Sequence, residues 1–260
     1  MATTILDGAT ELLLDATTAI EAAGISDYIV IGGWCPYLRN RSKLTHPGTL
    51  DVDILFKEGH RAGALDSAIE SLRRKGFVAS AKHSFQLLIA KTINAESLIY
   101  NIDLLHPRMS ETDKGLFVDH LGLDIPFDGQ GRRLKTFTSI ALPCSGVLFE
   151  EHLFSPFTLT GTKFNLVDFT GMLITKMDSC QKVKRERDSF DLYVALKSDG
   201  IDFKKLKRLR AENERIGLSL DGLVEYLSTD AETFDENVAQ FAVVDESPAN
   251  ALSKALHANI

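Results

Sequence analysis

Residues 31–56 read IGGWCPYLRNRSKLTHPGTLDVDILF and place a double glycine after one apolar run and two aspartates inside the next. In an extended strand, residues two apart point to the same face, so Asp51 and Asp53 share a face. Two carboxylates this close repel one another, and burying them without a partner is costly. A hard divalent cation, Mg²⁺ or Mn²⁺, resolves this repulsion, because it takes carboxylate oxygens as ligands and brings substrate phosphates with it.

The glycines and a third carboxylate fit the same chemistry. Gly32 and Gly33 permit a turn with unusual backbone angles and let N–H groups approach a phosphate without an intervening Cβ. Asp103 lies in a second apolar strand, where a lone charge is as hard to accommodate as the first two. If the two strands are neighbours, Asp51, Asp53 and Asp103 converge as ligands for two metal ions, which suits in-line attack on a phosphoryl group.

Composition limits the class of protein. With 260 residues, 44% hydrophobic and 25% charged, the chain is an ordinary globular protein that can bury a core without cross-links. Its three cysteines lack a C-x-x-C spacing, which predicts neither a zinc site nor a disulfide framework. We find no export signal and no apolar stretch of membrane length, and therefore expect a cytoplasmic protein without a membrane partner. The net charge of −7 disfavours generic attraction to polyanions, although local basic clusters can still hold an RNA end.

The apolar periodicity predicts an α+β fold, in which an antiparallel or mixed sheet is flanked by helices and followed by a C-terminal helical region. The expected helices cover residues 8–23 and 62–75, and the expected strands cover residues 28–34, 50–56, 77–81, 84–91, 98–107 and 135–143. After residue 160 nearly every run, FNLVDF included, has a helical pattern. We therefore expect an α/β domain over residues 1–160 and a helical domain over residues 161–260 that packs against it.

The hydrophobic-Gly-Gly turn, the Asp-x-Asp of the next strand and the later aspartate resemble the nucleotidyltransferase superfamily of DNA polymerase β. The resemblance implies that Asp51 and Asp53 bind metal ions. It also implies that Asp103 assists a metal ion and activates the attacking hydroxyl. Gly32 and Gly33 match the glycines of the turn along which the NTP triphosphate lies.

One departure from this family is the length of the connection between Gly33 and Asp51. Seventeen residues separate the two, more than in the tight polymerase version of the motif. Arg39, Arg41 and Lys43 fall in this extra length, where contact with phosphate is one use for them. Of the three, Arg39 is our candidate for nucleotide binding.

Residues 166–196 resemble the helix of AbiEii-type toxins, a branch of these nucleotidyltransferases found in bacterial toxin–antitoxin pairs. That helix carries a lysine and then an Arg-x-x-Asp-x-x-Asp-Leu-Tyr segment, which match Lys176, Arg185, Asp188 and Asp191. The resemblance implies that Lys176 binds the NTP and acts in catalysis, with a nucleotide-binding role for Asp188 and a catalytic one for Asp191. It further implies transfer to an acceptor hydroxyl, in some members the 3′ end of tRNA, and an antitoxin as partner.

Each candidate also has an ordinary structural interpretation. Asp-x-Asp pairs occur in exposed strands, and Lys176 can be a helix lysine that extends its ammonium group to solvent. Asp188 can pair with neighbouring basic residues three or four positions away. For Asp191, flanked by apolar residues on a helix that should be buried, we favour a functional or network role.

The sequence therefore predicts a metal-dependent nucleotidyltransferase that moves a nucleotide from an NTP to an acceptor hydroxyl. An RNA acceptor predicts a basic rim, for which Arg132, Arg133 and Lys135 are candidates. The basic run at residues 204–210 is interpreted as a solvated helix face. Two alternatives stay open: transfer to a cationic small molecule such as an aminoglycoside, and a non-catalytic nucleotide-binding protein.

Overall fold

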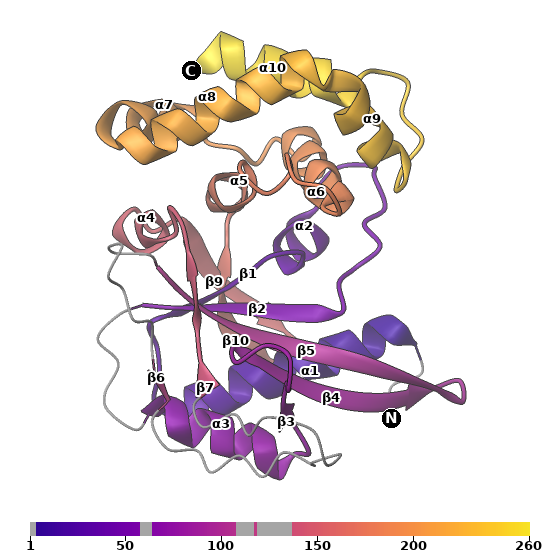
Figure 1. The fold of residues 1–260 in the computed structure, drawn as a ribbon, viewed down its shortest axis with the longest axis vertical. Coiled ribbons are helices and arrows are strands. Elements are labelled where there is room, and N and C mark those ends of the chain that lie inside the picture. Colours follow the sequence, from indigo (N-terminus) through magenta and orange to yellow (C-terminus); the bar gives the residue numbers. More distant parts are fainter. Residues whose placement is uncertain (1–3, 58–63, 108–116, 119–136) are drawn as a thin grey trace. The chain divides into compact units, whose positions relative to one another are not determined.

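The computed structural model describes residues 4–57, 64–107, 117–118 and 137–260 (Figure 1). The chain divides into two compact units. The sheet unit comprises residues 1–34, 48–150 and 154–166. The helical unit comprises residues 35–47, 151–153 and 167–260. The predicted α+β class, a mixed sheet flanked by helices and followed by C-terminal helices, is confirmed.

The sheet unit is built on a mixed sheet of eight strands in the order β3-β4-β5-β2-β1-β10-β9, with β8 paired to β5. The strands are β1 (Tyr28–Ile31), β2 (Asp51–Phe56), β3 (Val78–Ala79), β4 (Gln86–Ile93), β5 (Glu96–Pro107), β8 (Ile140–Leu142), β9 (Phe154–Leu159) and β10 (Thr162–Val167). A separate pair consists of β6 (Phe117–Val118) and β7 (Phe137–Thr138). Strand β2 runs parallel to β5 and antiparallel to β1, so the strand of Asp51 and Asp53 is adjacent to the strand of Asp103.

Apolar side chains of α1 (Ile5–Ala22) and of the central strands form the core of the sheet unit. Leu12 and Leu13 of α1 and Val52 and Ile54 of β2 are fully buried, and each such side chain contributes about 1.5–3 kcal/mol to stability. Helix α1 packs across β2, β4 and β5, and α3 (Ala64–Arg74) packs against α1 (Figure 1). The packing of α1 thereby holds in place the strands that carry and flank the two aspartates.

The expected helical pattern of FNLVDF is wrong, because most of this segment forms β10. Val30 of β1 pairs with Leu166 in a parallel register. Thr160 and Gly161, at φ +47° and +86°, form a two-residue turn between β9 and β10, which suits a tight hairpin. The domain boundary expected near residue 160 falls in this turn. A short apolar run fits a strand and a helix equally well, and here pairing with β1 decides between them.

Helices make up the second unit. They are α2 (Trp34–Arg39), whose first residue belongs to the sheet unit, α5 (Phe169–Lys176), α6 (Glu186–Lys197), α7 (Phe203–Glu212), α8 (Glu214–Thr229), α9 (Ala231–Ala239) and α10 (Pro248–Asn259). Asp168 caps the N-terminus of α5, and its Oδ1 accepts a hydrogen bond of 2.8 Å from the Gly171 N–H. The short helices α2 and α4 (Gly146–Glu150) span too few residues to show a helical period, and we did not expect them. Among the described helices, none has the length and apolar character needed to cross a membrane.

Residues 35–47, most of the extra length between the glycines and β2, belong to the helical unit. The Arg39 Nε donates a hydrogen bond of 2.8 Å to the Val167 carbonyl. The Arg41 N–H donates one of 3.1 Å to the Ser198 hydroxyl at the end of α6. These bonds fix the segment against the last residue of β10 and the end of α6, both more than a hundred residues later in sequence.

Candidate functional site

The structure brings the three predicted aspartates to one face of the sheet unit. In the parallel pairing of β2 with β5, Asp53 lies opposite Asp103 and Asp51 lies opposite Asn101. All three carboxyl-bearing side chains are partly exposed, while the alternating residues of β2 are buried. Like charges placed opposite one another in a sheet repel, so this arrangement is unfavourable unless a partner balances it.

Amide side chains hold the Asp103 carboxylate in place. Its Oδ1 accepts hydrogen bonds from Gln86 Nε2 at 2.8 Å and from Asn101 Nδ2 at 2.9 Å. Burial raises the pKa of the Asp103 carboxyl, and the nearby Asp51 charge raises it further, while the two amides partly offset the shift. Asp103 is therefore a stronger base than an ordinary aspartate. Sequence reasoning missed both amides, although Asn101 shares the same-face spacing of the Asp51 and Asp53 pair.

The glycine turn is shaped around the Asp53 carboxylate. Gly32 follows β1, whose Ile31 pairs with Asp53, and adopts a left-handed φ of +72°. A Cβ at Gly32 would overlap Asp53 Oδ2, so the missing side chain leaves room for the carboxylate. Asp51 accepts a hydrogen bond from the Thr49 hydroxyl, and its carbonyl accepts one of 2.9 Å from the buried Trp34 indole. These contacts hold the backbone of β2 and the side chains of Asp51 and Asp53 in place.

Replacing Gly32 with alanine should destabilise the fold and displace the Asp53 carboxylate. A left-handed backbone costs an L-residue about 1–2 kcal/mol, and the overlap with Asp53 adds to that cost. Gly161→Ala is the matched control, because Gly161 also has a positive φ of +86° but no atom within 4 Å of a Cβ. Urea unfolding should show a larger loss for Gly32→Ala. Equal losses would mean that the space beside Asp53 is not needed.

The donors on this face suit a hard cation. Carboxylate oxygens are the ligands that Mg²⁺ and Mn²⁺ prefer, and the repulsion between Asp51, Asp53 and Asp103 favours a positive partner. Within the described ranges, no three His, Cys, Asp or Glu side chains are already gathered as a metal-binding group. The residues therefore fit a magnesium or manganese ion by their chemistry.

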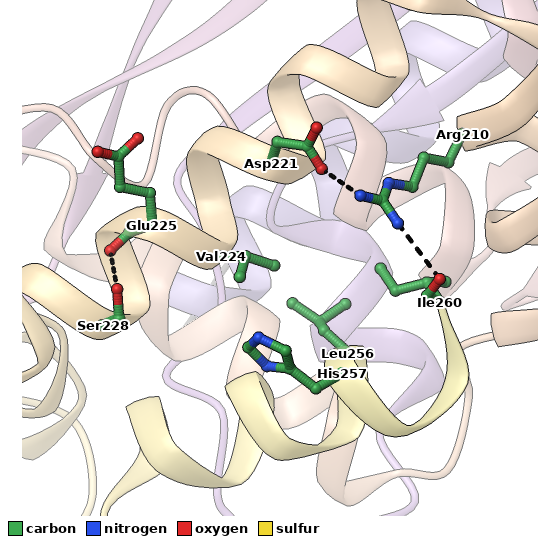
Figure 2. Close-up of a pocket in the computed structure, with 8 residues that line it drawn as sticks. All are labelled: Arg210, Asp221, Val224, Glu225, Ser228, Leu256, His257 and Ile260. Carbon is green, nitrogen blue, oxygen red and sulfur yellow. Dashed lines mark hydrogen bonds and ion pairs between the residues drawn. The ribbon is translucent and has the colours of Figure 1, made fainter.

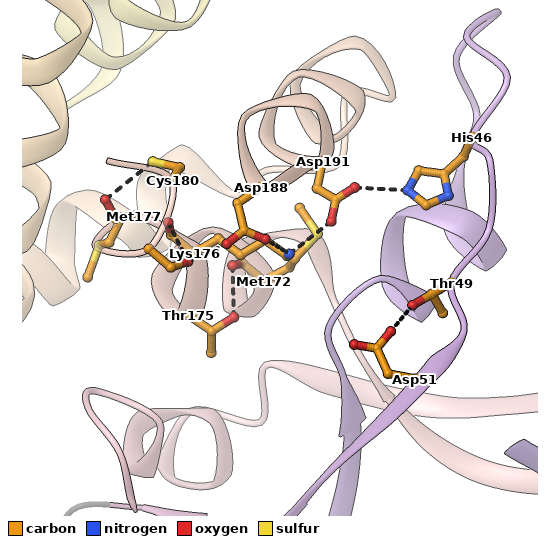
Figure 3. Close-up of polar contacts among 11 residues, drawn as sticks. His46, Thr49, Asp51, Met172, Thr175, Lys176, Met177, Cys180, Asp188 and Asp191 are labelled. Carbon is orange, nitrogen blue, oxygen red and sulfur yellow. Dashed lines mark hydrogen bonds and ion pairs between the residues drawn. The ribbon is translucent and has the colours of Figure 1, made fainter. Parts of the chain in front are cut away.

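The helical unit contains a buried ionic network (Figure 3). Lys176 at the end of α5 forms ion pairs with Asp188 and, at 2.8 Å between Nζ and Oδ2, with Asp191 of α6. The other Asp191 oxygen lies 2.8 Å from Nε2 of His46, and both side chains are almost completely buried. The Ser179 hydroxyl donates a hydrogen bond of 2.7 Å to Asp188. These contacts link residues 35–47, α5 and α6 within the unit.

Opposite charges keep the network ionised despite its burial. Burial by itself lowers the pKa of the Lys176 ammonium, but Asp191 and Asp188 outweigh this effect, and the pKa is raised. Burial by itself raises the pKa of Asp191, but Lys176 and His46 outweigh it, and the pKa is lowered. Because an ionised carboxylate only accepts hydrogen bonds, the His46 Nε2 carries the proton that faces Asp191.

These contacts can be compared with the ordinary structural interpretations of Lys176, Asp188 and Asp191. Lys176 is buried and does not extend its ammonium group to solvent. Asp188 pairs with Lys176 of the preceding helix rather than with the basic residues around it. Asp191 is completely buried and lies in a network, as its apolar neighbours in sequence indicate. His46, the remaining member, has no sequence signal, because its partner lies 145 residues away.

The remaining predicted residues are placed as follows. Arg39 is bound to the Val167 carbonyl in the helical unit. The basic-rim candidates Arg132, Arg133 and Lys135 lie outside the described residues. Asp51, Asp53, Asp103 and the two glycines belong to the sheet unit, and Lys176, Asp188 and Asp191 belong to the helical unit.

A pocket of about 370 Å³ opens between α7, α8 and α10 (Figure 2). It is lined by Arg210, Asp221, Val224, Glu225, Ser228, Leu256, His257 and Ile260. The Arg210 guanidinium is occupied by Asp221 Oδ1 at 2.7 Å and by the Ile260 carbonyl at 3.2 Å. None of the predicted site residues lines this pocket, so it adds nothing to the predicted chemistry.

Acid should weaken the network of the helical unit. Asp191 has a pKa below its ordinary 3.8, so its stabilisation is fully present above that value and is lost as the pH falls through the lower, folded-state pKa. We expect the stability difference between the wild type and Asp191→Asn to be constant near neutral pH and to shrink below about pH 4. Urea unfolding of both proteins from about pH 7 to pH 3 checks this. A constant difference over the whole range would contradict it.

We compared the chain with known proteins. No protein-family model matches it. No curated protein matches it either. Among solved structures, it is similar to an antigenic nucleotidyltransferase-like protein from Paracoccidioides brasiliensis, with a TM-score of 0.44 and 12% identity, covering 88% of this chain and 92% of that one. We therefore base the proposed function on the residues described above.

Proposed function

We propose that this protein is a metal-dependent nucleotidyltransferase, which moves a nucleotide from an NTP to an acceptor hydroxyl. The main support is the register of β2 and β5, which sets Asp53 opposite Asp103 with Asp51 on the same face. The second support is Gly32, whose missing side chain leaves room for the Asp53 carboxylate. A fold without a use for these charges has no reason to place three carboxylates together, which argues against a non-catalytic relic.

In this proposal Asp51 and Asp53, assisted by Asp103, hold Mg²⁺ or Mn²⁺. When bound, the ion would neutralise phosphate charge and polarise the α-phosphorus. The backbone at Gly32 and Gly33 would line the triphosphate, since no Cβ intervenes at either position.

Asp103 is the proposed base. Its two amide hydrogen bonds give a carboxylate that is held in a fixed orientation. It would take the proton of the acceptor hydroxyl while that oxygen attacks the α-phosphorus in line. The bond between the α-phosphorus and the bridging oxygen breaks, and pyrophosphate leaves.

The roles proposed for the helical unit rest on the resemblance to AbiEii-type toxins. On that resemblance Lys176 would bind the leaving phosphates, and because its ammonium group is buried against Asp188 and Asp191, a phosphate would have to displace one of these carboxylates. The ion pairs that Lys176 already forms favour a role in which both carboxylates position the ammonium group. Arg39 would contribute a second cation. The 3′ end of tRNA as acceptor, the toxin role and an antitoxin partner are likewise proposals from this resemblance.

The test is direct labelling. The purified protein is incubated with each α-³²P-labelled NTP, Mg²⁺ or Mn²⁺ and total RNA, and the products are separated on a denaturing gel. Label on RNA that disappears with a chelator supports RNA nucleotidyl transfer. Label on an added aminoglycoside instead would support the small-molecule alternative. Absence of label on RNA, protein and small molecules with every NTP and both ions would overturn the proposal.

A further inference from the structure

The segment that joins α5 to α6 forms an exposed, strongly basic loop. Residues 181–187, here called the basic loop, include the first two residues of α6, read QKVKRER and contain four basic side chains and one acid. The first five residues are exposed, and Val183 at the centre is 90% exposed. This concentration of positive charge stands out in a chain with a net charge of −7.

The cations of the basic loop are not neutralised within the described part of the chain. Lys182, Lys184, Arg185 and Arg187 form no ion pair or side-chain hydrogen bond there. The arginines of α7 and α8 behave differently. Arg208 pairs with Glu151, Arg210 with Asp221 and Arg215 with Asp178. The positive charge of the loop is therefore available to a partner outside the described part of the chain.

The backbone of the basic loop is held in a defined turn. The Lys182 N–H donates a hydrogen bond of 3.0 Å to the Ser179 carbonyl, and the Asp188 N–H donates one of 2.9 Å to the Arg185 carbonyl. Lys184 between them adopts a left-handed φ of +66°. Because Ser179 and Asp188 both belong to the buried network, the loop is fixed at its two ends. The backbone that carries its cations is thus held by hydrogen bonds at both ends, which lowers the backbone entropy lost on binding.

We propose that the basic loop binds the sugar–phosphate backbone of a nucleic-acid strand. Lysine and arginine side chains supply most contacts to phosphate, and such contacts need no particular base sequence. An acidic protein is the competing partner, but protein interfaces are depleted in lysine and enriched in aromatic residues and arginine, and only the two arginines of the loop fit that composition. The loop has two lysines and no aromatic residue, which favours phosphate.

This inference rests on the proposed function in one respect, namely that the bound strand is the acceptor of the nucleotide. A row of unneutralised cations attracts a polyanionic acceptor and repels a cationic one such as an aminoglycoside. Its charge therefore favours a nucleic-acid acceptor over a cationic small molecule.

The test measures binding and not transfer, so it is independent of catalysis. Fluorescence anisotropy follows labelled RNA and DNA strands of one sequence, about 20 nucleotides long, between about 50 and 200 mM salt. In Lys182→Ala/Lys184→Ala/Arg185→Ala the affinity at low salt should fall on the order of tenfold or more. The slope of log K against log salt should become shallower by about 2, because each phosphate contact contributes roughly 0.7 for single strands. An unchanged slope and affinity would overturn the proposal.

The matched control removes the same charge elsewhere in the helical unit. Lys204, Lys207 and Lys254 are exposed, and their combined change to alanine should leave the slope nearly unchanged. Equal losses in both variants would mean diffuse attraction and overturn a specific surface. If the loop binds polyglutamate but not nucleic acid, the proposal is overturned, and the partner is an acidic protein instead of a nucleic-acid strand. Loop-dependent binding of nucleic acid without any transfer would sustain this inference while the proposed function fails.

Discussion

Replacing Asp53 with asparagine should abolish nucleotide transfer while leaving the protein folded. Asparagine keeps the shape of aspartate but removes the charge that would hold the metal ion beside Gly32 and opposite Asp103. We expect kcat/KM to fall on the order of 10³-fold or more, the scale seen when a main electrostatic contribution to the transition state is lost. The measurement is the transfer rate at saturating Mg²⁺, together with urea unfolding.

The control is Asp27→Asn, which removes one exposed carboxylate from the turn before β1. It should retain full activity. Transfer at the wild-type rate by Asp53→Asn would remove the basis of the proposed site.

Replacing Lys176 with methionine should cause the largest loss of stability. Methionine fills a similar volume but leaves the Asp188 and Asp191 carboxylates buried without their cation. Breaking a buried ion pair in this way costs about 3–5 kcal/mol, much of the stability of an ordinary domain. Urea unfolding at neutral pH gives the value, and Lys204→Met on the exposed face of α7 is the control.

A rescue experiment separates the loss of charge balance from the loss of packing. Adding Asp188→Asn and Asp191→Asn to Lys176→Met removes the uncompensated charges and should recover part of the stability. If the triple variant is less stable than Lys176→Met alone, the carboxylates are not the source of the cost. A loss below about 1 kcal/mol in the single variant would mean that water screens the network.

The sequence predicts the sheet unit better than the helical unit, because the main features of the sheet unit depend on patterns within short stretches of sequence. Strands β1, β2 and β5 each show their own apolar pattern, and the same-face spacing of Asp51 and Asp53 follows from strand geometry alone. The placement of Asp103 opposite Asp53 also depends on the parallel register of β2 and β5, which the sequence does not show. Gly32 is also predictable, because a left-handed turn favours glycine.

The features that escaped prediction depend on partners far away in the sequence. Phe164–Val167 is apolar enough for a helix or a strand, and only pairing with β1 settles the choice. His46 and Arg39 carry no local sign that they bind elements beyond residue 166. The basic loop is visible in the sequence, but its lack of acidic partners appears only when the neighbouring helices are in place.

The bond between His46 and Asp191 has a consequence for how the protein is made. A ribosome adds about 5–20 residues per second, so the 145 residues between the two take on the order of ten seconds to synthesise. During that interval residues 35–47 have left the ribosome, but α6, which they bind, does not yet exist. A nascent chain stalled before α6 should therefore expose this segment to added protease, and release of the full-length chain should protect it.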